Sequence, residues 1–224
     1  MNISVIIPAL NEGAGIGTAL QQLEGMEGIE IIVSDGGSSD DTLEIAKKYS
    51  RVTTSEPGRG RQMNAGVSVA TGDLFLFLHA DTKLPDNWKD VVISAMSEDQ
   101  AVCGAFSLGI DSKKNFHRII AAAANIRTGI TNIPYGDQGI FVRRSVFERI
   151  GGFREIPIME DVDLMRRLKR EGKVVIQREK AITSARRWEK EGVIYSTFRN
   201  WVLITLYYLG VQPERLYRFY KAVR

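Results

Sequence analysis

Four acidic residues stand where a carboxylate can bind a ligand. Glu12, Asp35 and Asp81 each follow a short apolar segment, and Asp161 lies at the start of a segment with helical spacing. In open α/β sheets, ligands bind in the crevice beyond the carboxyl ends of the strands, where an acid can hold a metal ion or a polar substrate. We therefore expect these four side chains to converge on one edge of a single sheet.

Asp81 follows the most apolar of these segments, the run 74–78. That run lies between Gly72 and Pro85 and is typical of a strand buried on both faces. Taken alone, the position of Asp81 fits two roles equally well. It either caps the helix that follows or binds a metal or substrate at the strand end.

The elements that must position these acids alternate regularly over the first hundred residues. Apolar runs predict strands, and apolar residues three and four positions apart predict helices. The expected order is strand 3–7, helix 16–23, strand 29–33, helix 43–49, strand 52–54, helix 62–70, strand 74–78 and helix 85–96. Successive strand–loop–helix units imply a parallel sheet with right-handed crossovers, so their loops face the same edge.

Beyond residue 100 the pattern is less regular. We expect strands at 102–108, 140–142, 174–176 and 181–183, and helices at 116–129, at 145–150, from 160 onward and through 193–224. The predicted fold class is α/β, with a mostly parallel central sheet flanked by helices and a C-terminal helical appendage. Residues 57–61 predict a loop whose glycines and arginines suit close approach to an anionic ligand.

Composition narrows the class of protein. The 224 residues are 44% hydrophobic and contain no linker or repeat, which favours one continuous catalytic domain. A net charge of +3 is too small to indicate nucleic-acid binding. The single cysteine, Cys103, excludes an internal disulfide and fits a reducing compartment. We expect no signal peptide and no membrane span, and hence a cytoplasmic protein that is at most peripheral at the inner face of the membrane.

Four motifs follow one another along the chain: Pro8-Ala9-Leu10-Asn11-Glu12, Ser34-Asp35-Gly36-Gly37-Ser38-Ser39-Asp40, His79-Ala80-Asp81 and Glu160-Asp161. In this order and spacing they closely resemble the family-2 glycosyltransferases, which have the GT-A (Rossmann-like) nucleotide-sugar fold. The resemblance implies a GT-A domain over 1–190, with a nucleotide-sugar half at 1–100 and an acceptor half at 101–190. Residues 191–224 then form a helical extension that is not an independent domain. The segment 58–66 resembles a small subgroup of transferases associated with radical-SAM and selenium-related proteins.

The resemblance implies a nucleoside diphosphate sugar as donor, with a UDP-sugar favoured. The implied residues are Pro8, Ala9 and Glu12 in the wall around the base and ribose, Asp35 on the base, Ala80 at the nucleotide, and Arg61 on the diphosphate or base. The chemistry agrees, because a carboxylate can accept the imide N–H of uracil or a pair of ribose hydroxyls. A guanidinium fork suits a diphosphate or a base.

The resemblance also implies a divalent cation, Mn or Mg, between the two phosphates. Asp81 matches the last position of the family's DxD motif, and His79 stands where the first Asp of that motif would be. An imidazole can ligate Mn, but it weakens the binding of a hard ion such as Mg. His79 is therefore either a metal ligand or a buried histidine at the strand end.

The family inverts the anomeric centre by one in-line displacement. Its acidic pair at a helix start corresponds to Glu160 and Asp161, which makes Asp161 the candidate general base for the acceptor hydroxyl. Residues that resemble the family's acceptor side are Asp137, Gln138, Arg187 and Trp188. The last two match the Arg-Trp of the Gln-x-x-Arg-Trp signature of processive synthases. Because Ser184 replaces the Gln, we do not expect processive synthesis.

Other functions stay open on the sequence. An NAD-type oxidoreductase would explain Gly13 and Gly15 after the first strand, although Thr18 stands at the third glycine of the fingerprint. A nucleotidyltransferase would share the metal-binding acid, and a relative that binds nucleotide sugars without turnover would share the whole site.

The basic C-terminal helices fit three roles. They either cap the domain, form a homo-oligomer interface or lie on an anionic membrane surface. The apolar run 201–211 is flanked by basic residues, namely Arg199, Arg215, Arg218, Lys221 and Arg224.

Overall fold

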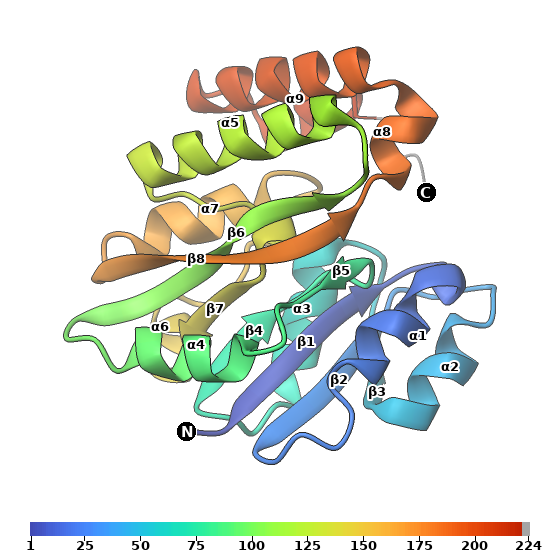
Figure 1. The fold of residues 1–224 in the computed structure, drawn as a ribbon, viewed down its shortest axis with the longest axis vertical. Coiled ribbons are helices and arrows are strands. Elements are labelled where there is room, and N and C mark those ends of the chain that lie inside the picture. Colours follow the sequence, from blue (N-terminus) through green and yellow to red (C-terminus); the bar gives the residue numbers. More distant parts are fainter. Residues whose placement is uncertain (221–224) are drawn as a thin grey trace.

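The computed structural model describes residues 1–220, apart from the side chains of Arg187 and Ile194. Within that range the strands form one eight-stranded sheet in the order β3-β2-β1-β4-β7-β6-β8-β5 (Figure 1). The strands are β1 (Ile3–Ala9), β2 (Ile29–Asp35), β3 (Arg51–Thr54), β4 (Leu74–Phe77), β5 (Thr82–Lys83), β6 (Ala101–Asp111), β7 (Ile140–Arg143) and β8 (Lys173–Ser184). The helices are α1 (Gly13–Gln21), α2 (Thr42–Tyr49), α3 (Arg59–Ser68), α4 (Trp88–Met96), α5 (Asn115–Thr131), η1 (Gly136–Gln138), α6 (Arg144–Arg149), α7 (Glu160–Leu168), α8 (Arg186–Glu191), α9 (Val193–Tyr208) and α10 (Pro213–Tyr217).

The first half of the sheet is parallel. β1 pairs in parallel with β2 and with β4, and β2 pairs in parallel with β3. Strand β7 is antiparallel to both β4 and β6, whereas β6 and β8 are parallel. The predicted α/β class is confirmed, and the carboxyl ends of β1, β2 and β4 meet at one edge because these strands run in the same direction.

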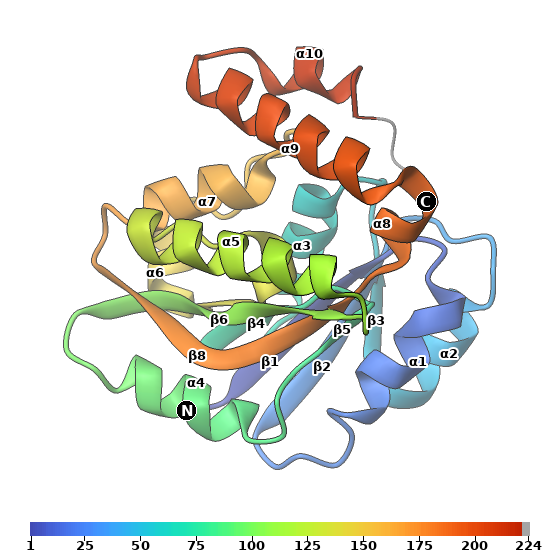
Figure 2. The ribbon, with the colours of Figure 1, turned by 45° about the horizontal axis from the view of Figure 1, so that its top comes forward.

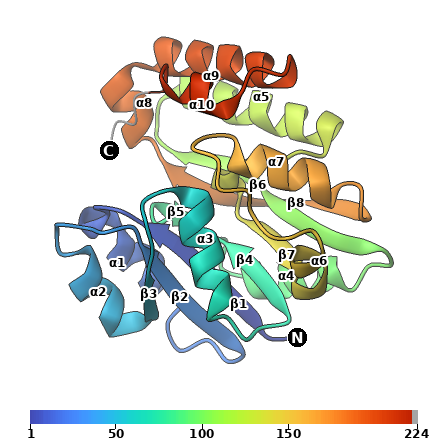
Figure 3. The ribbon, with the colours of Figure 1, turned by 180° about the vertical axis from the view of Figure 1, so that it is seen from behind.

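The sheet is buried on both faces, which explains its continuous apolar strands. Successive side chains of β1 point to opposite faces. Val5 and Ile7 pack in a cluster with residues of α1, α2 and α4, whereas Ile6 packs with residues of α3, α6 and α7. Figures 1 and 3 show these two helical layers from opposite sides.

Among the boundaries that differ from the sequence predictions are those of β8, α3 and α4. The two strands expected at 174–176 and 181–183 are one strand, β8, which bends past β6 through register shifts instead of breaking. The loop expected at 57–61 already contains the first turn of α3, because Gly58 takes a positive φ of 139° and the helix starts at the next residue. The helix expected from residue 85 begins at Trp88, whose N–H closes a turn onto the Pro85 carbonyl.

The C-terminal segment α8 to α10 lies above the edge that carries the strand ends, and α9 runs beside α5 (Figures 1 and 2). Leu203 of α9 and Leu216 of α10 form a small core with Ile158, which lies two residues before α7. Among residues 1–220, no helix combines the length and the hydropathy that a membrane span needs. The expected helix 193–224 is thus two helices separated by Gly210, and residues 221–224 lie outside the described range.

Candidate functional site

A cleft of about 320 Å³ opens at the carboxyl edge of the parallel strands. It brings together most of the residues that the sequence singled out, from segments far apart in the chain. Its lining includes Pro8, Glu12, Arg59, His79, Ala80, Asp81, Asp137, Asp161, Arg186 and Trp188. The expected convergence of acids on this edge therefore holds for Glu12, Asp81 and Asp161.

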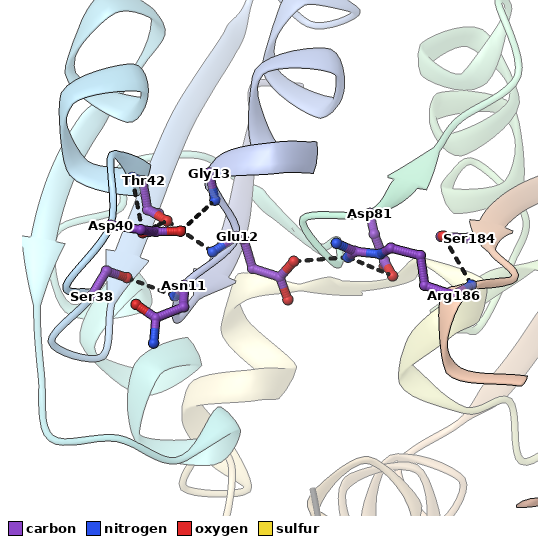
Figure 4. A network of polar contacts seen from close by, with 9 residues as sticks. All are labelled: Asn11, Glu12, Gly13, Ser38, Asp40, Thr42, Asp81, Ser184 and Arg186. Carbon is purple, nitrogen blue, oxygen red and sulfur yellow. Dashed lines mark hydrogen bonds and ion pairs between the residues drawn. The ribbon is translucent and has the colours of Figure 1, made fainter. Parts of the chain in front are cut away.

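The loop after β1 is held by side chains of the loop after β2 (Figure 4). The Asn11 N–H donates to the Ser38 hydroxyl at 2.9 Å, and the Glu12 N–H donates to the Thr42 hydroxyl at 2.8 Å. The Gly13 N–H donates to the Asp40 carboxylate at 3.0 Å, at the N-terminus of α1. These bonds fix the backbone of the first motif, so the Glu12 carboxylate is presented toward the cleft.

Asp35 and Ala9 lie behind this wall and do not line the cleft. The Asp35 side chain is 1% exposed and accepts the N–H groups of Gly37 at 2.8 Å and Ser38 at 2.9 Å, together with the Ser38 hydroxyl. The Ala9 carbonyl accepts the side-chain amide of the buried Gln62 at 2.7 Å. In this structure both residues shape the ends of β1 and β2.

Arg186 is the site residue that the sequence analysis missed. Its guanidinium lies between two of the predicted acids, 2.8 Å from a Glu12 oxygen and 3.3 Å from an Asp81 oxygen (Figure 4). The hydrogen bond to Glu12 raises the pKa of Arg186, although partial burial opposes the shift. Arg186 stands next to Arg187, the residue that the resemblance selected, and the side chain of Arg187 lies outside the described part of the chain.

Arg59, not Arg61, is the arginine of α3 that faces the cleft. Residues two apart on a helix point in nearly opposite directions, and Arg61 points outward to Glu155 at 3.1 Å. Arg59 pairs with Glu160 at 2.7 Å. The Glu160 charge is the main cause of the raised pKa of Arg59; burial opposes it, and Tyr220, Asp161 and Asp137 add to it.

The two members of the acidic pair have different surroundings. Glu160 is 2% exposed and does not line the cleft, because its carboxylate faces Arg59 from beneath the surface. Asp161 does line the cleft, and one of its oxygens accepts the Gly136 N–H at 2.8 Å. The other oxygen accepts the Val162 N–H at 2.7 Å. Asp161 is therefore held in one orientation by the loop across the cleft and by its own helix.

The loop around η1 supplies Asp137 to the cleft, whereas Gln138 supports that loop from below. Gln138 is fully buried, and its amide donates to the Phe106 carbonyl at 3.0 Å while accepting the Tyr135 N–H at 3.1 Å. Trp188 lines the cleft, with its ring centroid 5.9 Å from that of His117. Of the predicted acceptor-side residues, Asp137 and Trp188 thus line the cleft, whereas Gln138 is buried below the loop that carries Asp137.

The described part of the chain offers few ligands of its own for a metal ion. Among the described residues, no group of three or more His, Cys, Asp and Glu side chains is arranged to hold one. His79 lies against Gly136, where an added Cβ would be 2.8 Å from the imidazole Nε2. Asp81 still fits a cation of the Mg type, because such ions are held by one or two carboxylates together with the substrate's phosphates.

Comparisons with known proteins agree with this geometry. The sequence model described as glycosyl transferase family 2 matches residues 4–153. The probable glycosyltransferase YdaM of Bacillus subtilis is 27% identical over 228 residues, which cover 84% of this chain and 50% of YdaM.

Two solved structures share the fold, and both have the GT-A architecture that the sequence predicted. The mannosyltransferase PcManGT from Pyrobaculum calidifontis, in complex with GDP-Man and Mn²⁺, superposes with a TM-score of 0.69 at 18% identity, covering 99% of this chain and 65% of its own. TarS (1–349) of S. aureus, in complex with UDP-GlcNAc, superposes with a TM-score of 0.65 at 18% identity, covering 82% of this chain and 58% of its own. The chain therefore spans half of YdaM and less than two thirds of either of these solved chains. Because the family model matches more than half of its residues, the chain belongs to glycosyl transferase family 2.

Proposed function

We propose that the protein transfers a sugar from a nucleoside diphosphate sugar, preferably a UDP-sugar, to an acceptor hydroxyl with inversion at the anomeric carbon. The observation that carries this proposal is that two different sets of charged side chains line opposite sides of one cleft. Glu12, Asp81 and Arg186 form a charged network on one side, and Asp161 is held on the other. Family membership and the UDP-GlcNAc and GDP-Man complexes of its structural relatives support a nucleotide sugar as the donor.

On the donor side, Pro8, Glu12 and Ala80 would contact the nucleotide. Two guanidinium groups, of Arg59 and Arg186, line the same cleft and would bind the diphosphate, since charge-assisted hydrogen bonds from arginine suit phosphate oxygens. We therefore assign to Arg59 the diphosphate contact that the sequence suggested for Arg61. Asp35 and Ala9 would act on the donor indirectly, by shaping the wall.

Asp81 would hold a divalent cation, with the donor's phosphates as the other ligands. When bound, such a cation offsets the negative charge that develops on the leaving nucleoside diphosphate. The Mn²⁺ in the PcManGT complex supports this assignment. Arg186 would compensate the charges of Asp81 and Glu12 when no donor is bound.

On the acceptor side, Asp161 would remove the proton of the attacking hydroxyl. A carboxylate oxygen that accepts one backbone N–H keeps a lone pair for a proton, and the Gly136 bond fixes its direction. Asp137 and Trp188 would contact the acceptor, Gln138 would hold the loop that carries Asp137, and Glu160 would position Arg59. Apart from Arg186, which acts on the donor side, the proposed roles follow the chain, with residues 1–100 at the nucleotide, 101–190 at the acceptor and the extension from 191 beside the cleft.

The NAD-type alternative is disfavoured at the N-terminus of α1. A dinucleotide fingerprint places the pyrophosphate on the backbone N–H groups of that turn. Here the Gly13 N–H is already bonded to the Asp40 carboxylate, whose negative charge would repel a pyrophosphate.

A thermal-shift screen of UDP- and GDP-sugars with Mn²⁺ or Mg²⁺, followed by a nucleoside diphosphate release assay, tests the proposal. Stabilisation together with slow donor hydrolysis would support it. Stabilisation without hydrolysis under any condition would favour a binding protein without turnover. The absence of both stabilisation and hydrolysis would refute a nucleotide-sugar site.

A further inference from the structure

The outward faces of α5 and α9 are apolar and are left uncovered by the described chain. On α9, Phe198 is 68% exposed and Trp201 66%, and Leu209, which follows the last residue of the helix, is 75% exposed. The neighbouring α5 has the same character along its length, and its exposed apolar residues are Phe116, Ile119, Ile126 and Ile130. Figures 1 and 2 show the two helices side by side at the same end of the molecule.

Helix α9 is apolar on both sides, which is unusual for a surface helix. Its inner side packs through the buried Leu203, and Leu203 and Ile204 also line the cleft. Its outer side carries exposed apolar residues at helical spacing, namely Tyr195, Phe198 and Val202. The only charged residue of α9 is Arg199, which is largely buried against Glu191. Contiguous apolar surface of this kind marks a binding face.

Charge at this end of the molecule is positive. The segment 112–131, which contains α5, has four basic residues and no acidic residue. Three of these residues, Lys113, Lys114 and Arg118, are exposed, whereas the guanidinium of the fourth, Arg127, lies over the Tyr135 ring and bonds to Gln138. Arg215 and Arg218, at and after α10, are also exposed. Aromatic side chains beside lysine and arginine are the composition that suits a boundary between lipid headgroups and acyl chains.

We propose that α5 and α9 dock the protein on an anionic membrane surface. The exposed aromatic and aliphatic side chains enter the headgroup region, and the exposed Lys113, Lys114 and Arg118 pair with anionic headgroups. A second copy of the chain fits this face less well, because in a two-fold dimer the same positive segment would meet itself. Since the inner side of α9 lines the cleft, docking brings the cleft close to the headgroups.

Vesicle sedimentation with the full chain tests this proposal. The vesicles contain equal parts of phosphatidylglycerol and phosphatidylcholine, or phosphatidylcholine alone. We expect the protein to sediment with the anionic vesicles and much less with the neutral ones. Phe198→Gln/Trp201→Gln removes apolar contacts, and Lys113→Glu/Lys114→Glu reverses charge; each should lower the vesicle affinity roughly tenfold or more.

Lys47→Glu/Lys48→Glu is the matched control, because this pair is equally adjacent and exposed but lies on α2, away from α5 and α9 (Figure 1). It should leave vesicle binding unchanged. The proposal is overturned if the wild type binds no vesicles, or if the α2 variant weakens binding as much as the α5 variant. It is also overturned if sedimentation velocity shows a dimer that Phe198→Gln/Trp201→Gln dissociates while vesicle binding is absent. None of these measurements depends on sugar transfer.

Discussion

Two arginine–glutamate pairs join the same two segments of the chain but differ in burial, which allows a sharp test of the cleft electrostatics. Arg59 and Glu160 are 2.7 Å apart with side chains 21% and 2% exposed. Arg61 and Glu155 are 3.1 Å apart with side chains 48% and 56% exposed. The change Glu160→Gln keeps the shape of the side chain and removes its charge, and Glu155→Gln does the same at the exposed pair.

The stability that Glu160→Gln should lose follows from the Arg59 charge that is left without its ion-pair partner. Breaking a fully buried ion pair by removing one partner costs about 3–5 kcal/mol. The Arg59 side chain is 21% exposed and also interacts with Asp161 and Asp137, so we expect about 2–3 kcal/mol here. For a chain of this size about 1 kcal/mol lowers Tm by roughly 2–4 °C, which gives a decrease of about 4–12 °C. Glu155→Gln should cost about 0.5 kcal/mol or less and lower Tm by about 2 °C at most.

Differential scanning calorimetry of the two variants measures this difference directly. Arg59→Gln/Glu160→Gln adds a second test, because removing both charges should recover part of the stability lost in Glu160→Gln. Equal decreases in Tm for Glu160→Gln and Glu155→Gln would refute the reasoning. A double variant that is less stable than Glu160→Gln, instead of more stable, would also refute it. Either result would mean that the charge of Glu160 is not what holds Arg59 at the cleft.

Other predictions concern single residues. Asp161→Asn should lower turnover by about 10²–10⁴-fold while donor binding in a thermal-shift assay survives; unchanged turnover would remove Asp161 from the role of base. Asp81→Ala should weaken donor binding in the presence of Mn²⁺ more than in its absence, and titration calorimetry with and without the ion measures the difference. Burial raises the pKa of Cys103 to about 12, so its thiol stays protonated at pH 8 and should react with iodoacetamide only after unfolding. Labelling of the native protein would contradict the buried position.

The sheet could be predicted from sequence because burial on both faces produces continuous apolar runs. The strands at 3–7, 29–33 and 74–78 appear in the structure within a few residues of their predicted bounds. Parallel order then places the residues after them at one edge, which is why Glu12 and Asp81 were correctly expected to lie together. The polar middle of β8 hid its continuity, since residues 177–180 lack the apolar signal of a buried strand.

Side-chain direction could not be predicted in the same way. Choosing Arg59 over Arg61 requires the starting residue of α3, because a shift of two residues turns a side chain to the other side of the helix. Asp35 has the residue type and strand-end position of a ligand, but one of its oxygens already accepts the N–H groups of Gly37 and Ser38, and the other accepts the Ser38 hydroxyl. Gln138 likewise stands beside Asp137 in sequence and points into the core.

The network around Arg186 shows why the cleft is a property of the whole chain. Glu12 and Arg186 are separated by 174 positions, and Arg186 reaches both Glu12 and Asp81 from the end of β8. The position of Glu12 in turn depends on Thr42, and the first motif's backbone depends on Ser38 and Asp40. Each local motif therefore fixes the backbone on one side of the cleft. The charges of Glu12 and Asp81 are balanced by Arg186, which follows the last strand of the sheet. A variant at Arg186 should consequently affect donor binding as strongly as one at Glu12, although its surrounding sequence resembles an acceptor-side signature.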